Sequence, residues 1–451
     1  MSKNTEFSVR EQIVSFVQRK GRIHLSGIIG GLYWRNGAEL VEETIKLIED
    51  DVLDAEFIAK DEGQPGHWYV MPNQDVEDTD NTKKLYGGFL YPTKGKATMD
   101  VIDIMSRVRL KFDPPSPSEL RNVDKYLRAE IRKVTRKGSV VKSCDMAFDY
   151  RGRLYFTDWV NPALQKEVRN NFTFKDGSKI HWIDATSSGI QMLSILSRCE
   201  ESAKACNLIN TGTRRNAYAE VADRWGKTKD MVKKPVMTSF YGSKKVPEQT
   251  FGDEVGEFYD ILSETMPGAW AVNEEFLALH KECNADTLQW EWEMPDGFKV
   301  DASVFVTEYQ EATAEMFGHT CEMTIGFRVN KPSKSNKFLS ANLAHSMDSY
   351  VLREVIRLAS KTSLGCDSED EALFRAFIND DKPFEIVPIH DCFGVREENI
   401  KDVQDIYAYV LSKLVDSSFP EYVKQHFNVD WDSGTLTGED IMKSQFALVE
   451  E

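Results

Sequence analysis

The expected fold of this chain rests on one stretch near the end of its sequence, Phe384-Glu385-Ile386-Val387-Pro388-Ile389-His390-Asp391-Cys392-Phe393-Gly394-Val395. Two apolar runs flank a His-Asp pair, a pattern that predicts a tight β-hairpin with the Asp391 carboxylate at its tip. A carboxylate on a rigid turn between buried strands is well placed to hold a divalent cation. Taken alone, this stretch is better explained as an apolar hairpin in which the Asp has no function. Whether Asp391 binds a metal ion therefore has to be decided from other residues.

The bulk composition is that of a soluble, folded protein. Of the 451 residues, 41% are apolar and 29% are charged, and no apolar run is long enough to span a bilayer. Residues 1–12 lack the apolar core of a secretory or mitochondrial signal, and seven cysteines without a Cys-x-x-Cys pair favour reduced thiols. The net charge of −17 argues against nucleic-acid binding over the whole surface. Basic residues nevertheless gather in 121–142 and 214–245, where they would suit a channel for an anionic polymer.

A second carboxylate ends another predicted strand. Ile180-His181-Trp182-Ile183-Asp184 is followed by Ala185-Thr186-Ser187-Ser188-Gly189-Ile190-Gln191, whose small residues let the backbone approach a ligand. Because Mg²⁺ takes few carboxylates plus substrate phosphates, Asp184 and Asp391 would suffice, with the Ala185 carbonyl as a further oxygen ligand. Two metal ions held in this way serve phosphoryl transfer. Strand-end Asp residues also arise by chance in a chain with 73 acidic residues.

The third feature is a predicted helix with lysines and a terminal tyrosine. Lys229 and Lys233 are i,i+4 neighbours, so both ammonium groups project from one face of the helix. Tyr241 follows two turns later, just before Gly242, a natural helix C-cap. A nucleoside triphosphate needs cations for its phosphates and an aromatic ring for its base or sugar, and this helix offers both. A solvated basic helix accounts for the same residues.

Together and in this order, these features resemble the single-subunit RNA polymerases of the T7-phage and mitochondrial kind. The resemblance covers residues 149–447. Its first motifs are an Asp-x-Arg-Gly-Arg-x-Tyr signature at Asp149-Tyr150-Arg151-Gly152-Arg153-Leu154-Tyr155, motif A at 184–191 and motif B at 233–242. The later ones are a hairpin at Met294-Pro295-Asp296-Gly297-Phe298, a histidine segment at Asn342-Leu343-Ala344-His345-Ser346-Met347-Asp348, motif C at His390-Asp391 and a Phe-Ala ending at Phe446-Ala447.

The resemblance implies a role for each matched residue. Asp184 and Asp391 would coordinate two Mg²⁺ ions, with help from the Ala185 carbonyl. Lys233 would contact the incoming triphosphate and protonate the leaving pyrophosphate. Tyr241 would sense the ribose 2′-OH and stack near the templating base.

The other implied contacts are to substrate or nucleic acid. His345 would touch the nascent base pair from the minor-groove side. The remaining contacts would come from Arg151, Arg153, Lys229, Gly242 and His390. At Lys229 the family usually has arginine, and lysine keeps the charge without the bidentate phosphate geometry.

The implied fold class is α+β: a right-hand polymerase whose palm and fingers surround an antiparallel palm sheet, mostly helical elsewhere, with a small N-terminal module. That module is expected to be winged-helix-like or helical, because two helical stretches precede two short apolar ones in 8–71. The expected domains are the N-terminal module at 1–72, an acidic linker and basic helical connecting region at 73–145, a first palm segment with motif A at 146–200, fingers with motif B at 201–380, and a second palm segment with motif C and the C-terminal tail at 381–451.

The region before Asp149 is too short for the family's N-terminal promoter-binding half. This implies a split enzyme, like the heterodimeric RNA polymerases of N4-like phages, in which a smaller second subunit supplies the N-terminal domain. A recruitment factor or single-stranded DNA-binding protein is a further implied partner, beside DNA template, nascent RNA and ribonucleoside triphosphates, with no membrane. The implied location is the cytoplasm of an infected bacterial host.

The leading interpretation is therefore the catalytic subunit of a DNA-directed RNA polymerase, which joins ribonucleoside triphosphates to an RNA 3′-OH and releases pyrophosphate. One alternative is a family A-like DNA polymerase, although the segment 184–191 lacks the acidic residue expected where deoxyribose is selected. Another is a non-catalytic DNA- or partner-binding subunit with a decayed polymerase core. The intact Asp184, Lys233, Tyr241 and Asp391 speak against decay.

Overall fold

The computed structural model describes residues 8–20, 23–25, 27–28, 37–58, 67–72, 96–113, 140–144, 146–149, 151–156, 169–282, 290–302, 306–316, 319–329 and 339–450. Helices and small antiparallel sheets alternate along these ranges. Most of the linker and basic helical region expected at 73–145 lies outside them. No helix in the described ranges is long and apolar enough to cross a membrane.

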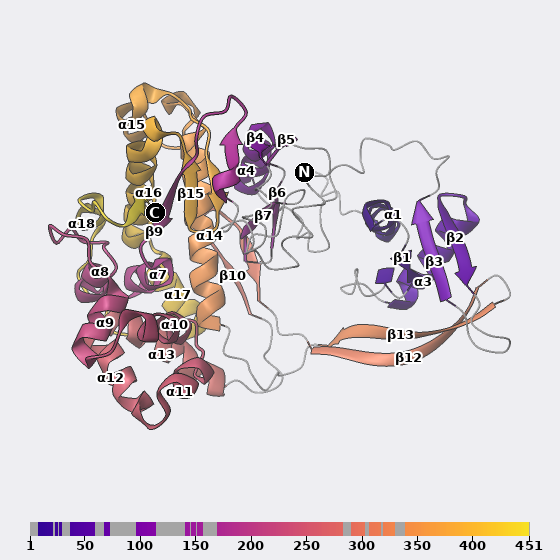
Figure 1. Ribbon diagram of the computed structural model, residues 1–451, viewed down its shortest axis with the longest axis horizontal. Coiled ribbons are helices and arrows are strands. Elements are labelled where there is room, and N and C mark those ends of the chain that lie inside the picture. Colours follow the sequence, from indigo (N-terminus) through magenta and orange to yellow (C-terminus); the bar gives the residue numbers. More distant parts are fainter. Residues whose placement is uncertain are drawn as a thin grey trace. The chain divides into compact units, whose positions relative to one another are not determined.

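The chain divides into two units, and the first comprises Met1–Pro92, Ala285–Gln289 and Ser303–Lys334. Its elements are α1 (Val9–Lys20), β1 (Ile23–His24), α3 (Gly37–Glu49), β2 (Leu53–Ile58), β3 (His67–Pro72), β12 (Val306–Met316) and β13 (His319–Val329) (Figure 1). The two helices and two strands expected in 8–71 are present as α1, α3, β2 and β3, and β1 adds a third strand in the order β1-β3-β2. The long hairpin β12–β13 groups with this unit, although its residues fall in the range expected for the fingers.

The second unit contains a four-stranded antiparallel sheet in the order β14-β15-β9-β16. Its strands are β9 (His181–Ala185), β14 (Val387–Ile389), β15 (Cys392–Val395) and β16 (Leu448–Glu450). The predicted hairpin is confirmed, because Ile389 pairs with Cys392 and the two residues between them form the turn. β16, which no sequence pattern indicated, pairs with the other side of β9.

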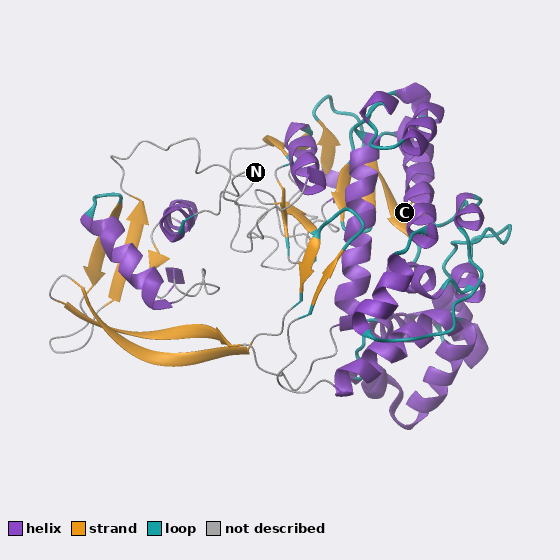
Figure 2. Ribbon diagram, turned by 180° about the vertical axis from the view of Figure 1, so that it is seen from behind, coloured by secondary structure: helices purple, strands orange, loops and turns teal. Residues whose placement is uncertain are grey.

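Three helices pack against one another: α7 (Ser188–Ser197), α14 (Leu339–Ala359) and α16 (Ile400–Asp416) (Figure 2). α16 also packs against β15 and β16 of this sheet. α14 is buried over almost its whole length, as expected for a helix surrounded by other elements. α16 carries an apolar stripe at Val403, Ile406, Val410 and Leu414, and all four side chains are buried. These helices and the sheet share one apolar core.

The chain between β9 and α14 forms further helices of the second unit. Among them, α10 contacts α9 and α11, and α12 contacts α9 and α13. Their bounds are α8 (Glu200–Ala205), α9 (Ala217–Trp225), α10 (Lys229–Phe240), α11 (Lys245–Phe251), α12 (Val255–Thr265) and α13 (Pro267–Glu282). The remaining helices of the unit are α4 (Lys96–Arg107), α15 (Glu369–Phe377), α17 (Phe419–Phe427) and α18 (Gly438–Met442).

Three small sheets complete the second unit. β4 (Arg109–Phe112) lies between β5 (Val140–Ser143) and β8 (Phe172–Phe174), and β6 (Met146–Phe148) pairs with β7 (Leu154–Phe156). β10 (Glu291–Glu293) and β11 (Lys299–Asp301) form the hairpin predicted around Pro295-Asp296-Gly297, where Gly297 has a φ of 78° that favours glycine.

Candidate active site

Asp184 and Asp391 lie at the ends of neighbouring strands. Cys392 is the register partner of Asp184, and the backbone N–H of Ala185 donates to the Asp391 carbonyl at 3.1 Å. His390 has a φ of 57°, which suits the first central position of a two-residue hairpin turn. The β9–β15 pairing therefore brings the two carboxylates, far apart in sequence, to one edge of the sheet.

The sharp turn between β9 and α7 is held by groups from two other places in the chain. Ser187 adopts the left-handed conformation, and the Thr186 N–H donates to the Ala447 carbonyl at 3.0 Å. The buried Gln191 amide also donates to Ala447 O, at 3.0 Å, and accepts from the Tyr407 hydroxyl at 2.7 Å. The segment before β16 thus fixes the turn that follows Asp184.

Tyr241 caps α10 and turns its ring toward α7 and α14. Gly242, at φ 75°, ends the helix as the sequence predicts. The Tyr241 ring lies 4.8 Å from the His345 ring, and a Cβ at Gly189 would be 2.9 Å from the Tyr241 hydroxyl oxygen. Burial raises the pKa of Tyr241, and nearby carboxylates, Asp348 first, raise it further. Because residue 189 is a glycine, the Tyr241 hydroxyl has room to lie beside α7.

The Asp149 carboxylate organises the loop between β6 and β7. It accepts from Arg151 Nε at 3.0 Å and Nη2 at 2.6 Å, and from the Tyr155 hydroxyl at 3.2 Å. Arg151 Nη1 in turn lies 3.2 Å from His345 Nδ1, and the Tyr155 ring packs edge-on against His390 at 5.3 Å. One carboxylate thus links the arginine signature to both histidines predicted from the sequence.

Both histidines are held in the neutral form. Burial, followed by the charges of Arg153 and Arg151, lowers the pKa of His345 to about 2. Burial and Arg153 lower the pKa of His390 to about 4, although Asp391 acts in the opposite direction. Among the described residues, His390 Nδ1 and Arg153 Nε are buried polar atoms without a hydrogen-bond partner. Two polar atoms are therefore left for a bound molecule to satisfy.

Asp348 is a site residue that the sequence reasoning missed. Its side chain accepts from Ser188 Oγ at 3.4 Å and lies 3.9 Å from Arg153 Nη2. Burial, and then the charge of Asp391, raise its pKa to about 7. Asp348 stands three residues after His345 on α14, and this shared helix face was the signal that could have identified it.

Tyr218 on α9 is a second residue that was missed. Its helix is capped by Asn216, whose side chain accepts from the N–H groups of Tyr218 and Ala219. Burial raises the pKa of Tyr218, and the carboxylates of Asp391 and Asp184 raise it further. A phenol therefore lies within the electrostatic reach of both strand-end carboxylates. No sequence signal pointed to it.

We call the joined residues the central cluster. It comprises Asp149, Arg151, Arg153, Asp184, Ser188, Tyr218, Tyr241, His345, Asp348, His390 and Asp391. The predicted Lys229 and Lys233 lie on α10 as expected, and both are exposed. Within the described ranges, neither lysine forms an ion pair with a member of the central cluster.

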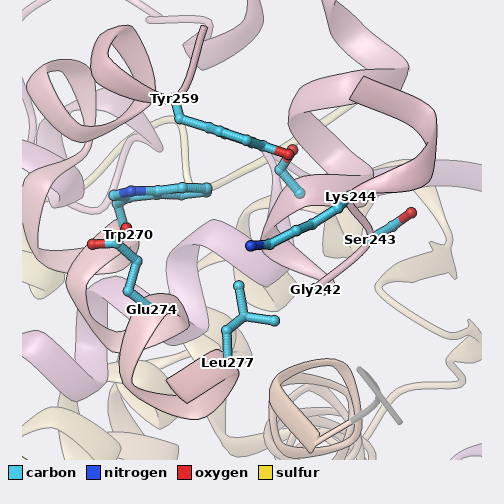
Figure 3. A pocket seen from close by; sticks show the side chains of 8 residues that line it. Gly242, Ser243, Lys244, Tyr259, Trp270, Glu274 and Leu277 are labelled. Carbon is cyan, nitrogen blue, oxygen red and sulfur yellow. The ribbon is translucent and has the colours of Figure 1, made fainter. Parts of the chain in front are cut away.

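A pocket begins directly beyond Tyr241, at the end of α10 (Figure 3). The side chain of Lys244 points into it, toward Trp270 and Leu277. The Tyr259 and Trp270 rings stack with centroids 5.5 Å apart. The hydroxyls of Ser239 and Tyr259 are buried there and have no hydrogen-bond partner in the described part of the chain. The pocket therefore combines aromatic walls, a cation and two unsatisfied hydroxyls.

The donor set at the sheet edge fits a hard cation. Asp184 and Asp391 offer carboxylate oxygens, and the Ala185 carbonyl, which accepts the Ser187 N–H at 3.0 Å, has a second lone pair. In the described ranges, no group of three or more His, Cys, Asp or Glu side chains could hold a metal ion by itself. Such a site suits Mg²⁺, which usually completes its shell with water and substrate phosphates.

The chain is similar to solved structures but to no known family. No protein-family model matches the sequence, and no curated protein matches it. Among solved structures, the chain is similar to the POL domain of Pol1 from M. smegmatis in complex with DNA primer-template and dNTP, at a TM-score of 0.36 and 13% identity. The similarity covers 64% of this chain and 48% of the mycobacterial one, so the chain spans about half of that structure.

Proposed function

We propose that this chain is the catalytic subunit of a DNA-directed RNA polymerase, which joins ribonucleoside triphosphates to an RNA 3′-OH on a DNA template. The observation that carries the proposal is the meeting of four sequence motifs in the central cluster. Asp184, Asp391, Tyr241 and His345 come from β9, the β14–β15 hairpin, the end of α10 and α14. Nucleotidyl transfer needs oxygen ligands for metal ions, cations for the phosphates and an aromatic ring for the nucleotide, all close to one another.

Several groups of the central cluster would have a task in this reaction. Two Mg²⁺ ions held by Asp184, Asp391 and the Ala185 carbonyl would supply the charge that activates the 3′-oxygen and stabilises the leaving pyrophosphate. Tyr241 would hold the ribose, with its hydroxyl near the 2′-OH, and His345 would contact the new base pair.

The arginines and lysines would serve the anionic substrates. Arg151 and Arg153 would hold nucleic acid beside the central cluster, and His390 would support the turn that carries Asp391. Lys229 and Lys233, exposed on α10, would meet the triphosphate, and Lys233 would donate the proton to pyrophosphate. Gly242 would let the template strand approach the end of the helix.

The proposal includes partners beyond the substrates. A smaller second subunit would supply promoter recognition. A recruitment factor or single-stranded DNA-binding protein would bring the pair to its template. In this arrangement the purified chain extends primers but initiates poorly on duplex promoters.

Primer extension tests the function directly. The purified chain, a single-stranded DNA template with an annealed RNA primer, Mg²⁺ and ribonucleoside triphosphates should give template-directed RNA. Deoxyribonucleotides in place of ribonucleotides should give little product. Extension that prefers deoxyribonucleotides would assign a DNA polymerase instead, and no extension with either set would assign a non-catalytic subunit.

Tyr241→Phe should weaken sugar discrimination while leaving extension intact. The phenylalanine keeps the ring between Gly189 and His345 but removes the hydroxyl that would sense the ribose 2′-OH. One hydrogen bond corresponds to about tenfold in the ratio of ribonucleotide to deoxyribonucleotide incorporation. Competition assays with both nucleotide types measure this ratio. Tyr409→Phe, the same change on α16 away from the central cluster, should leave it unchanged.

A further inference from the structure

Arg169 lies on the same face of the four-stranded sheet as the Asp184 side chain. Asp184 and Cys392 are register partners on β9 and β15, so their side chains stand next to each other on one face. Arg169 Nη1 donates to Cys392 Sγ at 3.6 Å. The same guanidinium lies over the Trp182 ring, 5.8 Å from its centroid, and Trp182 precedes Asp184 by two residues on β9. Arg169 therefore puts a cation close to the carboxylate that ends the strand.

The other face of this sheet is apolar and packed against a helix. Ile183 and Phe393 are register partners on that face, both are buried, and the Phe393 ring lies 6.0 Å from the Tyr407 ring of α16. Asp184 and Arg169, by contrast, are partly exposed. A ligand that touches both of these charged side chains would therefore lie on the face away from α16.

The backbone that carries Arg169 is held by a neighbouring small sheet. Arg169 begins a short 3₁₀ turn that ends at Asn171, and β8 follows directly. The Asn171 carbonyl accepts from the Asp113 N–H at 2.9 Å, and the Phe172 ring packs against Phe112 of β4 with centroids 4.6 Å apart. A fixed backbone limits the conformational entropy that the arginine loses when its guanidinium binds an anion.

Arg169 also lies away from the groups that would meet the triphosphate. Tyr241, at the end of α10, packs against Gly189 of α7, beyond the C-terminal end of β9. Arg169 contacts Trp182, which lies on the other side of Asp184 along the strand. In phosphoryl transfer the attacking and leaving oxygens are roughly in line, on opposite sides of the transferred phosphorus. With the triphosphate toward α10, the primer that carries the attacking oxygen would therefore lie toward Arg169.

We propose that Arg169 binds the phosphate between the last two nucleotides of the RNA primer. Two residues of a strand, from Trp182 to Asp184, span about 7 Å, close to the length of one nucleotide. A primer 3′-hydroxyl at Asp184 would thus bring the 5′-phosphate of its own nucleotide to Arg169. The planar guanidinium can donate two parallel hydrogen bonds to the oxygens of that phosphate. This inference rests on the proposed function, because it needs a primer end at Asp184.

A primer with one neutral linkage tests the proposal without any change to the protein. A methylphosphonate, which carries no charge, replaces either the terminal phosphate or one several linkages further back. All primers, including the one with ordinary phosphates, carry 2′-O-methyl sugars before both linkages to keep them stable. In single-turnover extension by the unmodified chain, the terminal methylphosphonate should slow the reaction at least about tenfold, the effect of one lost charge-assisted hydrogen bond.

Arg169→Met shows whether this effect passes through the arginine. The variant keeps the length of the side chain without its charge, and it should slow extension of the ordinary primer at least about tenfold. The terminal methylphosphonate should then slow the variant by less than about a further twofold, because the two changes remove the same contact. The inner methylphosphonate should slow both proteins by one factor. Arg109→Met, the same change at an exposed site on β4, should behave as the unmodified chain does.

Primer affinity, measured by fluorescence anisotropy without nucleotides, should follow the same pattern as the rates. An equal loss from the terminal methylphosphonate in Arg169→Met and the unmodified chain would mean that another group holds that phosphate, and the proposal would be wrong. A raised KM for ribonucleotides with unchanged primer affinity would assign Arg169 to the triphosphate instead. A chain that extends no primer would overturn the proposed function, while the affinities would still show whether Arg169 holds the phosphate.

Discussion

Asp391→Asn should reduce primer extension by at least about a thousandfold, or roughly 4 kcal/mol in the barrier. The substitution keeps the size of the side chain but removes one of the two carboxylate charges at the sheet edge. A neutral amide binds a divalent cation far more weakly than a carboxylate, so the reacting oxygens lose most of their stabilisation. Single-turnover extension of an RNA primer measures the rate, and binding of the primer-template should change little.

The matched control is Asp432→Asn, which makes the same change at an exposed carboxylate between α17 and α18. It should leave the rate within about twofold of the unmodified chain, since solvated surface charges are screened by salt. If Asp391→Asn extended primers at the normal rate, the two-metal mechanism would be wrong for this chain, whatever its fold.

Asp296→Ala should lower the free energy of unfolding by about 3–5 kcal/mol, because it leaves a buried guanidinium without its counter-charge. Asp296 accepts from Arg353 Nη2 at 3.0 Å, and the two side chains are 3% and 0% exposed. Arg353 also donates to the Gly152 carbonyl at 3.1 Å and lies over the Phe298 ring. The pair therefore joins α14, the β10–β11 turn and the arginine loop.

Urea unfolding followed by tryptophan fluorescence measures this loss. Asp103→Ala, which breaks the exposed ion pair with Arg107, should cost less than about 1 kcal/mol. The double variant D296L/R353M, which replaces both charges by apolar groups, should recover much of the stability. A cost below about 1 kcal/mol for Asp296→Ala would mean that another group neutralises Arg353.

The sequence predicts the parts of the site that depend on local chemistry. The hairpin at His390-Asp391 follows from alternating apolar runs around a turn, and the strand before Asp184 follows from the same rule. Tyr241 at the end of α10 follows from the glycine after it. Each of these features depends on about a dozen consecutive residues, so it can be predicted from a single sequence.

The parts that depend on distant pairings are not predictable in this way. Nothing near Asp348 indicates that Arg153 and Ser188 will surround it, because those contacts join α14 to a loop and to α7. β16 has three residues and no strong alternation, and it becomes a strand because β9 has an open edge beside Ala185. Tertiary packing decides such elements, and their local sequences are compatible with several structures.

The pairing of β9 sets the order in which the protein can fold during synthesis. β9 lies between β15 and β16, and 256 residues separate Gln191 from its hydrogen-bond acceptor Ala447. At ordinary ribosome speeds the wait for β16 is roughly 10–50 s. The strand that carries Asp184 has neither neighbour until β15 is made, and only one neighbour from then until β16 follows. The four-stranded sheet is thus completed late in synthesis, through contacts between residues far apart in the sequence.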